Sequence, residues 1–145
     1  TGKKSLAAAT LLFDILKGYI SVSIASKYFN ELVHLSALIC FIGHIFPIWL
    51  KFKGGKGVAT YLGIILGISF MLGFVFGITW LLIAIIFRYS SLSSMLSSMV
   101  VCIYSFYLGN ETQSYFLFII FVIIIFTHKE NINRLKNSKE NKIKL

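Results

Sequence analysis

The sequence predicts an all-α, polytopic integral membrane helical bundle. Of the 145 residues, 57% are hydrophobic and 13% are charged, whereas soluble domains are about half apolar and a quarter charged. The apolar residues form runs of the length that membrane helices need, roughly 20 residues, and the positive charges lie between these runs and in the tail. Because a small domain buries only part of its surface, we expect lipid to solvate the remainder.

The net charge of +9 is best explained by membrane topology. Lysines between apolar runs follow the positive-inside rule, and the basic stretches lack the aromatic residues that stack on RNA bases. We therefore predict no nucleic-acid partner. The sequence contains no Cys/His metal cluster and no Gly-x-Ser-x-Gly motif, and no histidine is followed by aspartate five residues later. These absences exclude several common hydrolase, metalloenzyme and acyltransferase mechanisms.

Apolar runs and their interruptions predict the helices in chain order. The first two are expected at 6–29 and 32–50, and Pro47 is expected to kink or end the second because proline interrupts helices. The run 58–87 is long for one span and short for two. A serine-containing helix is expected up to residue 108, a turn at Asn110 and Glu111, and a further helix at 115–126. The remainder, 129–145, is predicted to be a basic cytoplasmic tail.

The positive charges favour two short helices in 58–87, with a turn near Gly73. This arrangement places Arg88 and the tail on the same side as the lysines of loop 51–57, as the positive-inside rule requires. It gives six helices with both ends in the cytoplasm. Residues 1–4, 51–57, 88–91 and 128–134 are then expected to reach one membrane face.

The loop Lys53-Gly54-Gly55-Lys56-Gly57 is the first candidate site. Glycines allow backbone N–H groups to approach an anion, and the start of the next helix adds a favourable dipole. Lys56 is followed by glycine, which excludes a Walker A loop. A topology-setting cytoplasmic loop explains the same residues equally well.

Two further candidates lie within apolar runs. Asp14 and Lys17 share one helix face, and ionisable residues within a membrane are functional candidates by default; a mutual ion pair that permits burial is the alternative. His44 either shapes a site or makes a packing hydrogen bond.

The last candidates lie at helix ends. His128, Asn131 and Arg134 are spaced three residues apart and would share a helix face, where they could orient a hydroxyl and bind an anion. An interfacial cap is the alternative. Arg88 and Ser91 form a smaller unit that could bind an anion.

These motifs resemble those of a known family. The stretch 43–60, with His44-Ile45-Phe46-Pro47 and Lys53-Gly54-Gly55-Lys56-Gly57-Val58-Ala59-Thr60, resembles the second signature of the bacterial acyl-phosphate:glycerol-3-phosphate acyltransferases, the PlsY family. The tail from His128 to Leu135, with Glu140, resembles the third signature. The segments 88–92 and 14–18 also match, so the resemblance covers essentially the whole chain in order.

The resemblance implies an enzyme of the bacterial cytoplasmic (inner) membrane with its active site on the cytoplasmic face. It would transfer a fatty acyl group from acyl phosphate to the 1-hydroxyl of glycerol 3-phosphate, giving lysophosphatidic acid for phospholipid biosynthesis. Its partners would be these substrates, membrane lipid and an acyl-phosphate-producing enzyme, with no metal or organic cofactor. A small transporter or channel subunit for an anionic solute is the alternative function.

The resemblance also assigns roles residue by residue. The catalytic group would be His128, Asn131 and Lys56, with His128 or the acyl phosphate's own phosphate as the base. The substrate- and phosphate-binding group would be Lys53, Gly54, Gly55, Gly57, Ser91 and Arg134. The supporting group would be His44, Arg88, Asp14 and Lys17.

The sequence departs from the family pattern in two places. The family has seven helices, and its first helix and first signature are absent from residues 1–145, so this single acyltransferase domain is expected to be an inactive fragment. Ser138 stands where the third signature usually has glycine, which is expected to alter the turn before Glu140.

Overall fold

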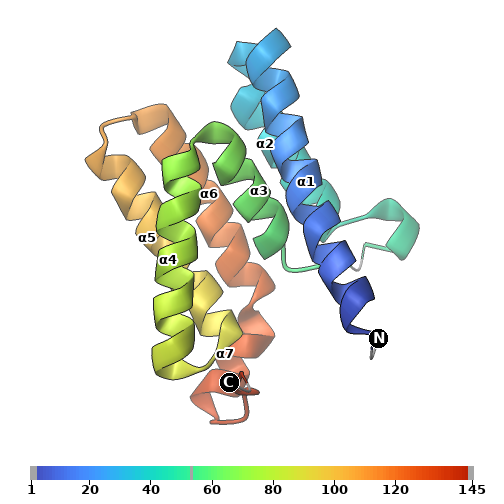
Figure 1. Ribbon diagram of the computed structural model, residues 1–145, viewed down its shortest axis with the longest axis vertical. Helices are drawn as coiled ribbons and strands as arrows, with labels where there is room; N and C mark the ends of the chain where they lie inside the picture. The colour runs from blue at the N-terminus through green and yellow to red at the C-terminus, as the bar shows by residue number, and fades with distance from the viewer. Residues whose placement is uncertain (1–2, 53, 144–145) are drawn as a thin grey trace. The chain divides into compact units, whose positions relative to one another are not determined.

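Helices joined by turns and loops are the only regular secondary structure among the residues that the computed structural model describes, 3–52 and 54–143. This confirms the predicted fold class. The chain divides into two compact units, residues 1–73 (unit 1) and 74–145 (unit 2), which are coloured from blue to green and from green to red in Figure 1. Each unit has its own packing.

Unit 1 contains α1 (Lys4–Tyr28), the 3-10 turn η1 (Asn30–Leu32), α2 (Val33–Ile45), the 3-10 turn η2 (Ile48–Leu50), α3 (Val58–Ile68) and the first residues of α4 (Phe70–Phe87). The second predicted helix is thus shorter than expected. It ends at Ile45 because Pro47 adopts an extended conformation, with φ −68° and ψ 126°, as proline favours at a helix end.

Glycines bring α1 and α3 into backbone contact. A Cβ atom on Gly63 would lie 2.0 Å from the carbonyl oxygen of Ile15, and one on Gly18 would lie 2.4 Å from that of Thr60. Real Cβ atoms do not approach so closely, and small residues are the usual means by which membrane helices pack at short distance. These two glycines therefore fix the spacing between the helix with Asp14 and Lys17 and the helix that follows the glycine loop.

The break in the long apolar run lies at Ser69, which separates α3 from α4 with φ −158° and ψ 124°. The predicted pair of short helices is correct, but the predicted turn position at Gly73 is wrong. Gly73 lies inside α4, where an added Cβ would be 2.3 Å from Leu66 Cδ2. Its small size serves close packing after the turn, a requirement that sequence alone does not distinguish from turn formation.

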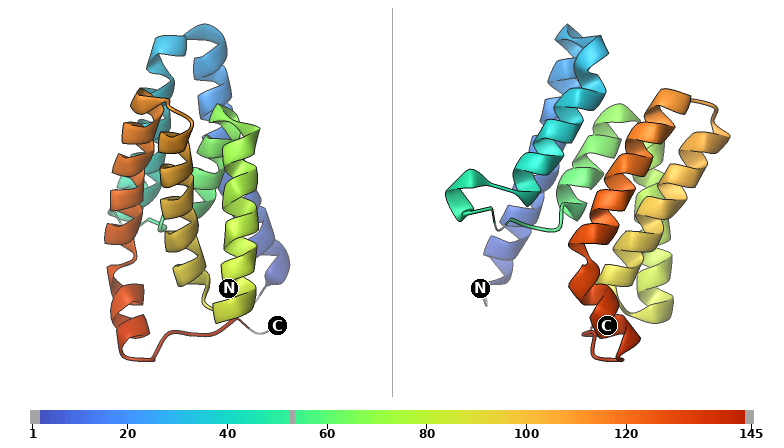
Figure 2. Two further views of the ribbon diagram at one scale, coloured as in Figure 1. Left: turned by 90° about the vertical axis from the view of Figure 1, so that its left-hand side faces the viewer. Right: turned by 180° about the vertical axis from the view of Figure 1, so that it is seen from behind.

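Unit 2 contains the rest of α4, followed by α5 (Ser90–Tyr107), α6 (Glu111–Thr127) and α7 (Lys129–Lys136). The helices α5 and α6 lie side by side in Figures 1 and 2. Small hydroxyl residues line their contact, where Ser114 Oγ donates to Ser105 Oγ at 2.9 Å. Trp80 Nε1 on α4 donates to Ser94 Oγ on α5 at 3.1 Å, so the serines of α5 join both neighbouring helices.

Helix α6 begins four residues before the predicted start. Asn110 accepts a hydrogen bond from the Gln113 backbone N–H at 3.1 Å, which is the usual N-cap interaction. The predicted tail is also more ordered than expected, because α7 occupies its first half at an angle of 59° to α6. The described residues thus form the six predicted helices and α7.

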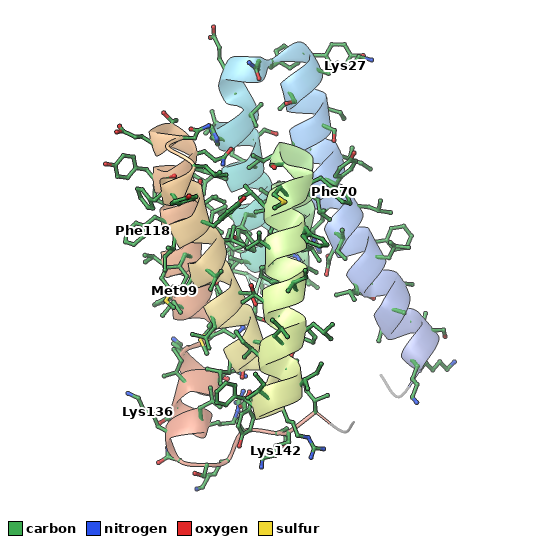
Figure 3. The ribbon with its side chains drawn as sticks, turned by 60° about the vertical axis from the view of Figure 1, so that its left-hand side comes forward. Lys27, Phe70, Met99, Phe118, Lys136 and Lys142 are labelled. Atoms are coloured by element: carbon green, nitrogen blue, oxygen red, sulfur yellow. The ribbon has the colours of Figure 1, made fainter. Side chains whose placement is uncertain are left out.

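The exposed surface fits a membrane protein. Among the described residues, helices or helix pairs at Lys4–Tyr28, Asn30–Leu50 and Phe70–Phe87 are long and apolar enough to span a membrane, and α6 with α7 could form a fourth, bent span. In unit 2, Met99 and Phe118 project outward from α5 and α6, while Lys136 and Lys142 lie beyond the apolar region (Figure 3). Lipid accounts for these exposed apolar side chains.

Candidate active site

The glycine loop of unit 1 connects η2 to α3 through a tightly constrained backbone. Gly54 N–H donates to the carbonyl oxygen of Ile45 at 3.1 Å, so this N–H is occupied within the loop. Gly57 is the N-cap of α3 and has φ +86°, a conformation that strongly favours glycine. A Cβ there would also lie 2.5 Å from Phe41 Cε2. The loop is therefore held in one conformation by contacts that exclude side chains.

This conformation delivers the chain into α3 as the sequence predicted. The first N–H groups of a helix lack intrahelical acceptors and form a partial positive charge. Lys56 is exposed just before them. In the first turn, Thr60 Oγ1 is buried and makes no hydrogen bond to any described residue. Lys53, the other predicted lysine, lies outside the described residues.

Asp14, Lys17 and His44 form a polar cluster between α1 and α2. Lys17 Nζ lies 2.5 Å from Asp14 Oδ1 and 2.6 Å from His44 Nδ1, and His44 Nδ1 is 3.4 Å from the same carboxylate oxygen. The structure therefore confirms that Asp14 and Lys17 share one helix face, and it adds His44, which sequence alone treats as a separate candidate. Mutual pairing is what permits ionisable groups within an apolar helix pair.

A pocket of about 480 Å³ opens beside this cluster within unit 1. Its polar lining comes from the cluster and from the glycine loop, and its apolar wall includes Ile39, Trp49 and Leu50. A pocket with polar and apolar walls suits a ligand that joins a polar group to a hydrocarbon group.

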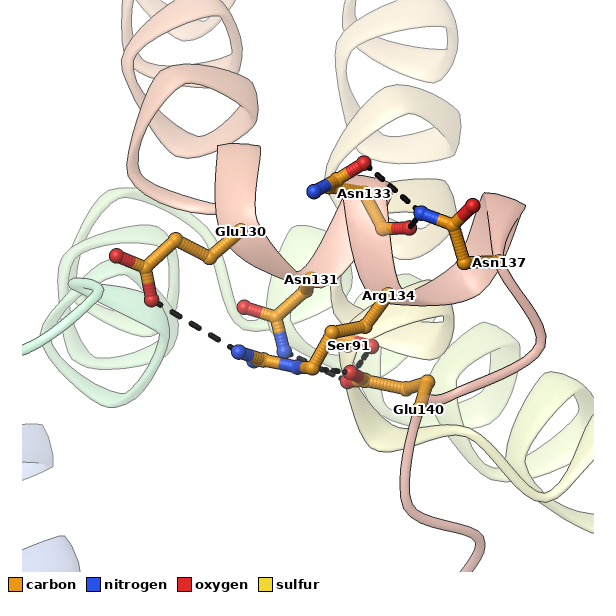
Figure 4. A network of polar contacts seen from close by, with 7 residues as sticks. All are labelled: Ser91, Glu130, Asn131, Asn133, Arg134, Asn137 and Glu140. Atoms are coloured by element: carbon orange, nitrogen blue, oxygen red, sulfur yellow. Dashed lines mark hydrogen bonds and ion pairs between the residues drawn. The ribbon is translucent and has the colours of Figure 1, made fainter.

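Unit 2 holds a second cluster, centred on Glu140 (Figure 4). Its Oε1 accepts hydrogen bonds from Ser91 Oγ and Asn131 Nδ2, both at 2.6 Å. Its Oε2 accepts from Arg134 Nε at 2.8 Å. Arg134 also lies 3.8 Å from Glu130. Three predicted site residues from α5 and α7 thus meet on a carboxylate that the sequence-based set of site residues omitted.

The Glu140 carboxylate is strongly held in its charged form. Its side chain is 9% exposed, and burial alone would raise its pKa. The three hydrogen bonds it accepts and the nearby guanidinium charge outweigh burial and lower the pKa of Glu140 from 4.5 to about 2. The carboxylate is therefore ionised at neutral pH and can only accept hydrogen bonds.

Asn131 and His128 are buried beside this cluster, with 4% and 2% exposure. Because the Glu140 carboxylate takes the Asn131 amide hydrogen, the amide oxygen Oδ1 faces elsewhere, and it makes no hydrogen bond to any described residue. His128 Nδ1 lies 2.8 Å from the carbonyl oxygen of Ile124. A carbonyl only accepts, so Nδ1 carries the hydrogen, and the lone pair of the neutral ring is on Nε2.

Arg88 lies at the turn between α4 and α5 and hydrogen-bonds to the C-terminal segment. Its Nε and Nη2 donate to the carbonyl oxygen of Ile143 at 3.2 and 3.1 Å, and Ile143 N–H donates to the Arg88 carbonyl at 2.6 Å. Arg88 has φ +61°, a strained conformation for a side-chain-bearing residue. This geometry assigns Arg88 to holding the C-terminal segment that carries Glu140.

Comparison of the sequence with known proteins identifies the family of this chain. Residues 1–138 match the family model for glycerol-3-phosphate acyltransferase. The chain is 47% identical over 145 residues to the glycerol-3-phosphate acyltransferase of Pelagibacter ubique (strain HTCC1062), covering 100% of this chain and 75% of that protein. Identity to the enzyme of Brucella anthropi is 47% over 143 residues, covering 99% and 71%.

Solved structures give the same result. Crystal structures of PlsY (YgiH), an integral membrane glycerol 3-phosphate acyltransferase, match with TM-scores of 0.93 for the glycerol 3-phosphate form and 0.92 for the lysophosphatidic acid form. Their identities are 32% and 33%; the matches cover 97% and 96% of this chain and 72% and 73% of those chains.

The helical fold and its match to PlsY together define a helical integral membrane acyltransferase. The chain belongs to the glycerol-3-phosphate acyltransferase family. Family membership favours this function over the transporter or channel alternative.

Proposed function

We propose that this protein transfers a fatty acyl group from acyl phosphate to the 1-hydroxyl of glycerol 3-phosphate, forming lysophosphatidic acid. The observation that supports this most directly is the pair formed by His128 and Asn131. Both are buried, the contact of His128 Nδ1 with the Ile124 carbonyl makes Nε2 the basic nitrogen of the neutral ring, and Asn131 Oδ1 is a buried acceptor with no hydrogen bond to any described residue. A hydroxyl substrate needs such groups, one to remove its proton and one to orient it.

In the proposed reaction, the 1-hydroxyl oxygen attacks the carbonyl carbon of the acyl phosphate. The bond between that carbon and the phosphate oxygen breaks, and phosphate leaves with the bonding electrons. The hydroxyl proton passes to His128 Nε2 or to an oxygen of the departing phosphate. Acyl phosphate is already activated, so positioning and charge neutralisation supply much of the remaining rate enhancement.

The proposed phosphate-binding groups are Lys56, with the loop of Gly54, Gly55 and Gly57, and Ser91 with Arg134. Lys56 is supported by its exposure next to the start of α3. For Ser91 and Arg134, the support is their existing use as anion donors, since both hydrogen-bond the Glu140 carboxylate. The same donor types bind phosphate oxygens.

The donor is tested with a full-length version of this sequence, one that includes the first helix and first signature of the family, in membranes supplied with labelled glycerol 3-phosphate. We expect lysophosphatidic acid with palmitoyl phosphate and none with palmitoyl-CoA; product from the thioester alone would disprove the donor assignment. Lys56→Ala should raise KM for glycerol 3-phosphate or abolish turnover. Lys27→Ala is the matched control, because Lys27 lies at the far end of α1 over the Tyr28 ring. Equal rates in both variants would remove Lys56 from the site.

We further propose that the protein resides in the bacterial cytoplasmic membrane as one domain, with the glycine loop and the basic tail on the cytoplasmic face. The distribution of lysine and arginine supports this orientation. Single cysteines at Lys56 and Tyr89 should react with an impermeant thiol reagent only from the cytoplasmic side, and one at Asn110 only from the opposite side. Opposite sidedness of Lys56 and Tyr89 would contradict the topology. The acyl-phosphate-producing enzyme is the expected functional partner, since the donor must be supplied continuously.

A further inference from the structure

His44 lies between the ion pair of α1 and the glycine loop, with one ring nitrogen facing each. Nδ1 is 2.6 Å from Lys17 Nζ. On the opposite edge of the ring, Nε2 is the atom nearest to Gly55, where an added Cβ would lie 2.4 Å from it. The imidazole therefore bridges the two parts of the pocket wall.

The ion pair determines the tautomer of this ring. A lysine ammonium has three donors and no acceptor. Lys17 is paired with Asp14 at 2.5 Å, so it donates to both the carboxylate and His44, and Nδ1 must be the unprotonated ring nitrogen. The neutral ring then carries its hydrogen on Nε2.

The resulting Nε2–H points toward the loop, where no described residue accepts a hydrogen bond from it. Among the described residues, the hydrogen bonds and ion pairs of His44 involve Nδ1 alone. Gly55 lies directly against this edge of the ring, and a side chain there would collide with Nε2. Both residues line the pocket of about 480 Å³. An oriented N–H donor at the edge of a pocket is suited to an anionic oxygen.

We propose that His44 is a substrate-binding residue whose Nε2–H donates a hydrogen bond to a phosphate oxygen in this pocket, and that Asp14 and Lys17 are positioning residues that fix its tautomer. This inference rests on the proposed function of the glycine loop. The phosphate belongs to glycerol 3-phosphate or to acyl phosphate, two ligands with the same anionic chemistry at this donor.

Two substitutions of His44 separate this role from simple pairing with Lys17. Glutamine extends far enough to place its amide nitrogen about where Nε2 lies, so His44→Gln keeps a donor toward the loop. Asparagine reaches only as far as Nδ1, so His44→Asn keeps a partner for Lys17 and loses that donor. A pairing role predicts that asparagine is the better replacement, whereas the proposed binding role predicts glutamine.

The assay measures KM for each substrate and kcat in membranes with matched protein amounts. We expect His44→Asn to raise KM for one phosphate substrate by about tenfold or more, and His44→Gln by about threefold or less, as for loss or retention of one hydrogen bond to a charged group. The substrate whose KM rises is the one held by Nε2. Ser36→Ala is the control, because Ser36 also joins α2 to α1, through a 2.8 Å hydrogen bond with Ser21 Oγ, but is not part of the pocket lining.

A second measurement does not depend on activity. In ¹⁵N-histidine NMR spectra, His44 should show an unprotonated Nδ1 and a protonated Nε2, and the double variant Asp14→Asn/Lys17→Met, which leaves no unpaired charge, should lose this preference. Wild-type KM values in His44→Asn, equal increases in both His44 variants, or a protonated Nδ1 would each overturn the proposal. Failure of acyl phosphate as donor would instead refute the proposed reaction and leave the NMR result standing.

Discussion

Replacing Glu140 by glutamine tests whether one carboxylate organises the polar end of unit 2. Glu140→Gln keeps the shape of the side chain and removes its charge. A glutamine amide has a single oxygen, so it cannot accept from Ser91, Asn131 and Arg134 as the carboxylate does at 2.6, 2.6 and 2.8 Å. Its NH₂ group must also face at least one of these donors.

The lowered pKa sets the scale of the expected loss. A fall from 4.5 to about 2 corresponds to about 3 kcal/mol in favour of the charged form. Solvent at the polar end of the unit screens part of this, leaving about 1–2 kcal/mol. The donor that the glutamine amide leaves unsatisfied adds about 1 kcal/mol. We expect Glu140→Gln to reduce the free energy of unfolding by about 2–3 kcal/mol at pH 7.

The pH dependence of the free energy of unfolding provides a second, independent test. Because the folded-state pKa of Glu140 is below the unfolded value, its electrostatic contribution is complete above about pH 4.5 and is lost as the pH falls toward 2. By pH 3 it retains roughly two fifths of its neutral value. The difference between wild type and Glu140→Gln, measured by equilibrium unfolding in detergent micelles, should therefore narrow between pH 6 and pH 3.

Glu130→Gln is the matched control for this prediction. Glu130 lies on α7 and pairs with the same arginine, but at 3.8 Å and with 79% of its side chain exposed. Exposed pairs contribute about 0–1 kcal/mol, so this variant should resemble wild type. Equal losses in the two variants, or a Glu140→Gln difference that stays constant down to pH 3, would refute the reasoning.

Three other substitutions, one of them with a matched control, test the backbone. Ser138→Gly should stabilise the protein by about 1 kcal/mol in the same unfolding assay, because Ser138 has φ +55° and positions with a left-handed backbone conformation favour glycine. A loss of stability would contradict this. Gly63→Ala should destabilise the protein by about 1–3 kcal/mol, since the new Cβ would lie 2.0 Å from the Ile15 carbonyl oxygen. Gly77→Ala is its control and should be neutral or slightly stabilising, because a Cβ at Gly77 would have no described neighbour within 4 Å. Gly57→Ala, at φ +86°, should raise KM for a phosphate substrate in the acyltransfer assay, and an unchanged KM would show that the loop conformation is not needed for binding.

Helix identity was predictable because it depends on local composition. Apolar runs, proline and the positive charges located α1 to α6, including the division of 58–87 into two helices. The errors occurred where long-range packing decides. Gly73 was taken for the turn, but it is needed against Leu66, and Ser69 forms the break. Sequence spacing does not reveal which small residue faces a neighbouring helix.

The site was predicted in part for the same reason. A three-residue spacing was enough to place Asn131 and Arg134 on one face of α7, and Asp14 with Lys17 on one face of α1. The partners that join them come from distant positions, Glu140 to Ser91 across 49 residues and His44 to Lys17 across 27. Glu140 was visible as part of the third signature, but its role required the path of the segment after α7.

That path also connects stability to chemistry. Helix α7 ends with Ser138 N–H bonded to the Leu135 carbonyl and Lys139 N–H bonded to the Arg134 carbonyl, a Schellman arrangement that reverses the chain and returns Glu140 to α7. Because an ionised carboxylate accepts only, it fixes the Asn131 amide with nitrogen toward Glu140 and oxygen away from it. The same carboxylate that stabilises the C-terminal segment thereby leaves the Asn131 oxygen as an open acceptor for the proposed hydroxyl substrate.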